Sequence, residues 1–110
     1  MKEYRIKPVY TQKGAQKRYG LFNKKTDAEG GTFSTLDEFT ELLCKLVKDK
    51  QISIGHAQNL IIESRKLRLP ICGTEDESIL KIVQISARYR KLGLFFMRVI
   101  LEPMVSVYYD

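Results

Sequence analysis

Lysine and arginine side chains are concentrated at the N-terminal end of this chain, and their chemistry is the clearest in the sequence. Residues 1–25 contain eight of them against a single acid, Glu3, which is a local net charge of +7, whereas the full 110 residues carry a formal net charge of +6. Cations in such a stretch attract polyanions, or an acidic protein surface, through long-range electrostatic forces. The sequence therefore predicts an anionic partner, either nucleic acid or an acidic protein.

Aromatic residues alternate with these bases, at Tyr4, Tyr10, Tyr19 and Phe22. Lysine and arginine neutralise phosphates, exposed rings stack on unpaired bases, and a two-stranded β-ribbon fits the major groove of a duplex. The alternative is that the aromatic face is core and the basic face is a solvated surface that protects a sheet edge. If the basic hairpin binds nucleic acid or another anionic partner, we expect these residues to contact it: Arg5, Lys7, Lys13, Lys17, Arg18, Tyr19, Lys24 and Lys25.

Support for catalysis is thin. His56 is the only histidine, and pairing it with Cys44 or Cys72 would supply a base and a thiol nucleophile, but neither a third orienting group nor a local signature accompanies them. The acidic run at residues 75–77 is typical of a helix start rather than a metal site. The glycines match neither known phosphate-loop spacing. We therefore predict a non-enzymatic protein with no cofactor and no metal.

Composition favours a cytoplasmic, reducing location. The two cysteines are in no close-spaced motif, and Cys44 lies in an apolar helical pattern that predicts a buried thiol. The sequence contains no apolar run of about 18 residues and no apolar segment after Met1, so neither a membrane span nor a secretory signal is expected.

The first 34 residues read as antiparallel strands. Residues 3–11 alternate, with Tyr4 and Ile6 on one face and Arg5 and Lys7 on the other, which predicts a strand with one apolar face. Pro8 cannot donate a ladder hydrogen bond, so this strand belongs at an edge or a bulge. Residues 12–17 are a turn, residues 18–24 the returning strand, residues 26–31 a second turn, and residues 31–34 a short third strand.

Three helices are expected next. Thr35 to Glu38 form a capping box that begins the first helix, the second follows Ser53 and is stopped by Pro70, and a second capping box at residues 74–77 begins the third. The first two helices form an αα-hairpin, which also resembles a helix-turn-helix. In that alternative the base-reading side chains would be His56, Gln58 and Asn59.

The C-terminal segment is dense in apolar and aromatic residues. Residues 94–101 predict a buried strand after Gly93, with a helix that continues past Gly93 as the competing interpretation, and residues 104–109 predict a final strand. The alternative role of residues 94–109 is an interface, which would make the protein a homodimer.

These elements predict one domain, residues 1–110, divided into a basic β region (1–34), a helical region (35–92) and a C-terminal strand region (94–109). The fold class is α+β: a small antiparallel sheet, made of the N-terminal hairpin and a C-terminal strand, packed against about three helices.

Residues 19–47 contain a small antiparallel sheet, a glycine-rich turn, Thr-Phe-Ser-Thr and an acidic helix start. This order is similar to the three-stranded-sheet-plus-helix modules at the N-termini of phage-type integrases, in which the sheet binds DNA. The resemblance lies in the types and order of the elements rather than in a specific motif. It therefore implies a similar fold more directly than a similar function.

We therefore expect a small non-enzymatic module that binds nucleic acid through its basic hairpin, with weak sequence specificity. The alternative is a protein-binding adaptor, inhibitor or immunity-type protein whose basic face docks on an acidic partner.

Overall fold

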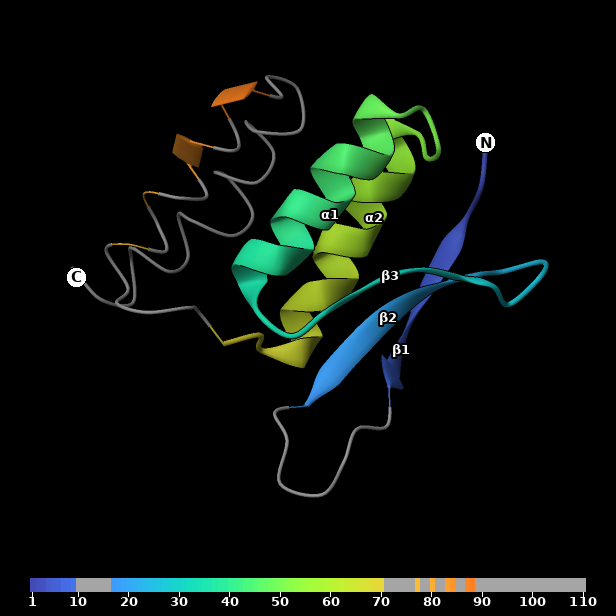
Figure 1. Ribbon diagram of the computed structural model, residues 1–110, viewed down its shortest axis with the longest axis horizontal. Helices are drawn as coiled ribbons and strands as arrows, with labels where there is room; N and C mark the ends of the chain where they lie inside the picture. The colour runs from blue at the N-terminus through green and yellow to red at the C-terminus, as the bar shows by residue number, and fades with distance from the viewer. Residues whose placement is uncertain (10–16, 71–76, 78–79, 81–82, 85–86, 89–110) are drawn as a thin grey trace.

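The computed structural model describes residues 1–9 and 17–70, together with residues 77, 80, 83, 84, 87 and 88. Three antiparallel strands precede two helices (Figure 1). The elements are β1 (Tyr4–Val9), β2 (Arg18–Asn23), β3 (Glu29–Phe33), α1 (Leu36–Lys48), α2 (Ile54–Ser64) and a 3₁₀ turn, η1 (Arg65–Leu67). The α+β class is confirmed, although about three helices is slightly more than the two described in full.

The predicted hairpin is confirmed, and its register places Ile6 opposite Leu21. β3 adds to the other side of β2, with Tyr19 opposite Phe33, so that the strand order is β1-β2-β3. The third strand begins at Glu29, two residues before the predicted start at residue 31, since Glu29 still pairs with Phe22 beyond a register shift between Leu21 and Phe22.

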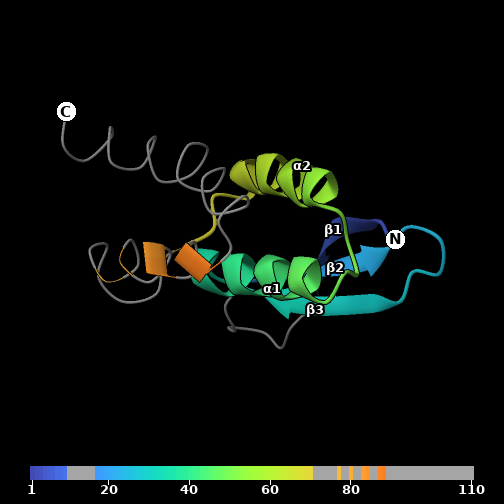
Figure 2. The ribbon, with the colours of Figure 1, turned by 90° about the horizontal axis from the view of Figure 1, so that it is seen from above.

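Both helices cover one face of this sheet. α1 packs against β3 and α2 against β1, and the two helices run antiparallel beside each other (Figures 1 and 2). Alternation along the strands directs Tyr4, Tyr19, Leu21 and Phe33 toward the helices, where they join one hydrophobic core. The ring of Phe39 from α1 lies 4.7 Å from that of Phe33, measured between centroids, and ties helix to sheet.

The predicted capping signals begin both helices. The hydroxyl of Thr35 accepts a hydrogen bond from the backbone N–H of Glu38 at 3.3 Å, and that of Ser53 accepts one from the N–H of His56 at 3.0 Å. The Glu38 carboxylate accepts from the backbone N–H of Ser34 at 3.2 Å, one residue before the position that a standard capping box uses. This bond also joins the end of β3 to the start of α1.

The second helix is shorter than its predicted stop at Pro70 implies. Its α-helical part ends at Ser64, whose hydroxyl donates to the carbonyl of Ile61 at 2.7 Å, and the chain tightens into η1. Arg68 then adopts a left-handed conformation with φ of 49°, which ends the helical run two residues before Pro70. Its buried residues are Ala57, Leu60, Ile61 and Ser64.

Beyond Pro70 the described positions are few. Residues 77, 80, 83, 84, 87 and 88 have helical backbone and are exposed, Leu80 by 59%. The rest of the predicted third helix, Cys72, the strands at 94–101 and 104–109 and the homodimer surface at 94–109 lie outside the described residues. Among the described helices, none has the length and apolarity that a membrane crossing requires.

Candidate functional site

The sheet face opposite the helices carries basic side chains of the hairpin and, among its described aromatic residues, the ring of Phe22. Arg5 is exposed and lies across from Phe22, and Lys7 lies across from Gly20. Strand alternation places these residues on this side because Tyr4, Ile6 and Leu21 occupy the other. We call the set Arg5, Lys7, Arg18, Gly20, Phe22 and Thr32 the open face.

The ring of Phe22 lies across Gly20 on this face. A Cβ atom at Gly20 would come within 2.8 Å of Phe22 Cε2 and 3.1 Å of Val9 Cγ2, so the absence of a side chain makes room for the ring. The ammonium group of Lys7 lies 4.6 Å from the ring centroid, within the range of a cation–π interaction. Because the ammonium lies over the ring, an unpaired base can stack on this half-exposed ring only when Lys7 moves away from it, for example to contact a phosphate.

Two cations of the open face have acidic neighbours. Lys7 Nζ lies 2.7 Å from Asp27 Oδ1 in an exposed ion pair. Such pairs contribute about 0–1 kcal/mol and are screened by salt, so a phosphate can compete with Asp27 for Lys7. Arg18 is held more firmly: its guanidinium donates to Thr32 Oγ1 at 3.0 Å and lies 3.7 Å from the Glu38 carboxylate. Arg18 thus joins the strands to α1.

Tyr19 does not belong to the open face. Its side chain points toward the helices and is only 8% exposed, with its ring 6.0 Å from that of Phe33 between centroids. The register explains this position, because Tyr19 lies one residue from Gly20 and successive side chains alternate. The aromatic side chain available for stacking is therefore Phe22 rather than Tyr19.

The remaining predicted lysines lie at the two ends of the hairpin. Lys17 is exposed just before β2, with its ammonium 5.3 Å from the centroid of Tyr19, and Lys13 lies outside the described residues. Lys24 and Lys25 are exposed in the turn after β2. There they border a pocket of about 560 Å³ together with Lys2 and Lys50, two residues that were not predicted as binding residues.

Of the residues considered for a thiol–imidazole pair, the structure describes Cys44 and His56, and both have structural roles. Cys44 is 1% exposed in the core, and burial, with a smaller contribution from the nearby Glu41 carboxylate, raises the pKa of its thiol to about 12. A thiol with this pKa is not a nucleophile near neutral pH. His56 Nε2 accepts a hydrogen bond from the backbone N–H of Tyr4 at 2.8 Å and so joins α2 to the start of β1.

This hydrogen bond requires a neutral imidazole, and it predicts a pH-dependent stability. Partial burial lowers the pKa of His56 below its usual 6.5, and Lys24 acts in the same direction against the carboxylates of Glu3 and Glu63. Because the unfolded state binds the proton more readily, the stabilising contribution is complete above pH 6.5 and is lost as the pH falls from there through the lowered pKa. Urea midpoints measured between pH 7.5 and 5.5 should therefore decrease on acidification.

The His56→Gln variant is the control for this prediction, because an amide oxygen can accept the same hydrogen bond without titrating. Its urea midpoint should change less over the same pH interval than that of the natural chain. Equal changes in both proteins would contradict the assigned role of His56.

The helix-turn-helix interpretation is not favoured by this arrangement. In that scheme His56 would face outward to read base edges, but its imidazole is directed to β1 and engaged there. Gln58 is half-buried and Asn59 exposed on the same helix. α1 and α2 thus form a packing hairpin that supports the sheet.

Within the part of the chain that the structure describes, no three side chains of the His, Cys, Asp or Glu types are grouped as metal ligands. The spacing of two residues within a strand places Phe22 on the same side as Gly20, but it does not tell which side the helices cover. Lys2 and Lys50 carry no such local signal, since only the folded chain brings them near Lys24.

Comparisons of the chain with protein-family models, curated proteins and solved structures give no match.

Proposed function

We propose that this protein is a small non-enzymatic module that binds nucleic acid through the open face of its sheet. The observation that carries the proposal is the half-exposed Phe22 ring lying over Gly20 with the Lys7 ammonium above it and Arg5 beside it. Among the described elements, the helices cover the other face and leave this side of the sheet to a partner. The cations would contact phosphates, and the movement of Lys7 from the ring to a phosphate would let the ring stack on a base.

Fluorescence anisotropy with a labelled single-stranded oligonucleotide and its duplex, each at two salt concentrations, tests the proposal. Replacing Arg5 and Lys7 with Gln should weaken binding to both and lower the slope of log K against log salt by about 0.9 per lost contact on the duplex. Phe22→Ala should weaken single-strand binding by about 1–3 kcal/mol.

The matched control replaces Lys45 and Lys48 with Gln, since both are exposed lysines in the last turn of α1 and neither belongs to the open face. This variant loses the same net charge and should bind almost as tightly as the natural chain. Equal losses from both double variants would overturn the location, and salt-independent or absent binding would overturn the function.

A second candidate is docking on an acidic protein. It is favoured by the two ion pairs, Lys7–Asp27 and Arg18–Glu38, because their carboxylates already neutralise part of the basic charge, and complementary charged groups fix the register of protein complexes. If the anisotropy test fails, docking on an acidic protein becomes the leading function. It would then be tested by co-purification of an acidic protein with the natural chain, with the Arg5→Glu variant as the negative control.

A further inference from the structure

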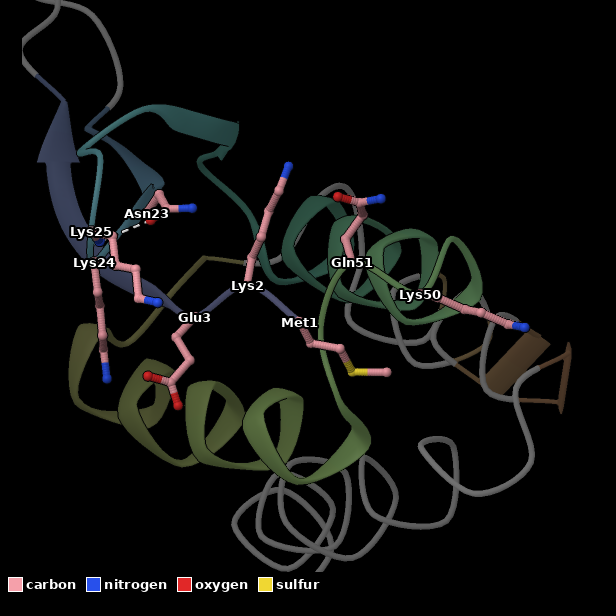
Figure 3. Close-up of a pocket in the computed structure, with 8 residues that line it drawn as sticks. All are labelled: Met1, Lys2, Glu3, Asn23, Lys24, Lys25, Lys50 and Gln51. Carbon is pink, nitrogen blue, oxygen red and sulfur yellow. Dashed lines mark hydrogen bonds between the residues drawn. The ribbon is translucent and has the colours of Figure 1, made fainter.

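Three segments distant in the sequence meet at one end of the sheet and enclose a pocket of about 560 Å³. They are the N-terminal residues before β1, the turn after β2, and the link between α1 and α2. Figure 3 shows the N-terminal residues lying between the other two segments. The lining residues are Met1, Lys2, Glu3, Asn23, Lys24, Lys25, Lys50 and Gln51.

Backbone hydrogen bonds hold the three segments together. Lys2 N–H donates to the carbonyl of Gln51 at 2.9 Å, and Lys24 N–H donates to the carbonyl of Glu3 at 2.9 Å. Asn23 Oδ1 accepts from the N–H of Lys25 at 2.8 Å, which fixes the turn. The walls of the pocket are thus positioned by main-chain contacts, whatever the conformations of its long side chains.

The charge of the pocket is strongly positive. Four lysines line it against one carboxylate, that of Glu3, which points toward α2 in Figure 3 and lies near enough to His56 to influence its pKa. The ammonium groups of Lys2, Lys24 and Lys50 point in different directions (Figure 3), as like charges on long side chains do. A ligand with several negative oxygens would draw these groups inward.

We propose that this pocket binds the phosphate groups of a nucleotide, either free or at the end of a nucleic-acid strand. The volume of the pocket accommodates a nucleotide-sized group. Four lysine ammonium groups can donate to several phosphate oxygens, and they suit such a ligand better than a ligand with a single carboxylate. The strand-end form of the proposal rests on the proposed function, because Lys24 and Lys25 continue the chain from β2 of the open face into the pocket.

Isothermal titration calorimetry of the full chain with pyrophosphate, ATP and adenosine tests the pocket without any nucleic acid. Pyrophosphate and ATP should bind and adenosine should not. Replacing Lys24 and Lys50 with Gln should weaken both by about ten-fold or more, whereas replacing Lys45 and Lys48 with Gln should leave them almost unchanged. No binding of either phosphate compound, or equal weakening by both double variants, would overturn the proposal.

A second experiment distinguishes a free nucleotide from a strand end as the ligand. It compares oligonucleotides that carry a 5′-phosphate, a 3′-phosphate or neither. Preference for a phosphorylated end that the Lys24 and Lys50 double variant abolishes would assign the pocket to a strand end. ATP binding without that preference would assign it to free nucleotides and overturn the strand-end form. Because Arg5 and Phe22 do not line the pocket, loss of oligonucleotide binding in their variants with unchanged ATP binding keeps the two proposals distinguishable.

Discussion

Replacing Phe33 with alanine is expected to lower the free energy of unfolding by about 3–5 kcal/mol, the cost typical of truncating a buried phenylalanine. Phe33 is fully buried at the end of β3, where its ring contacts those of Tyr19 and Phe39. Removing it would leave a cavity between the sheet and α1. For a small domain this loss is a large part of the total stability, so the variant should unfold at much lower urea concentration.

Phe22→Ala is the matched control, since Phe22 lies on the neighbouring strand but on the open face, where it is half-exposed. Its loss should cost about 1 kcal/mol, because part of the ring is already in water. If Phe33→Ala does not fold, Phe33→Leu should fold with a smaller loss and still give a measurable midpoint. Equal destabilisation at Phe22 and Phe33 would contradict the two-sided sheet.

The substitution of alanine at two glycines should have opposite effects on stability. Gly31 has φ of 140°, a conformation that side chains disfavour, and a Cβ atom there would lie 2.6 Å from Leu42 Cδ1. Backbone strain and overpacking each cost about 1–3 kcal/mol, so Gly31→Ala should destabilise by about 2–6 kcal/mol. Glycine at this position leaves room for the end of the Leu42 side chain from α1.

Gly55 is the comparison, since a Cβ atom there meets no atom within 4 Å and the residue lies in the first turn of α2. Alanine at this position should stabilise the protein by about 0.5–1 kcal/mol, because it restricts the unfolded chain and favours the helix. Thermal unfolding followed by circular dichroism measures the change in stability of both variants. A stabilising Gly31→Ala would show that Leu42 does not pack over β3.

Local patterns in the sequence were sufficient to predict the hairpin and the starts of the two described helices. Alternation of Tyr4, Arg5, Ile6 and Lys7 separates a buried from an exposed side within one strand. Thr35 and Ser53 begin helices through hydrogen bonds that span only three residues. These features depend on neighbours in the chain, which is why they can be read without a structure.

Local patterns did not predict which side chains belong to the candidate sites. Tyr19 was grouped with the basic residues, but its side of the strand depends on which face the helices cover, and a composition of bases and aromatics does not state that. Phe22 takes its place because register and packing place its ring over Gly20. His56, considered as a base or a base-reading residue, instead holds β1 through a hydrogen bond across 52 positions.

The sequence by itself therefore determined the kinds and order of the elements between residues 4 and 64 and the positive charge at the N-terminal end, because propensity, capping and charge act over a few residues. Tertiary structure alone decided which side of the sheet is open, and it brought Lys2, Lys24 and Lys50 around one pocket. The physical reason is that such a pocket is made by packing and by backbone hydrogen bonds between distant segments, such as Lys2 to Gln51, and these leave no periodic trace in the sequence.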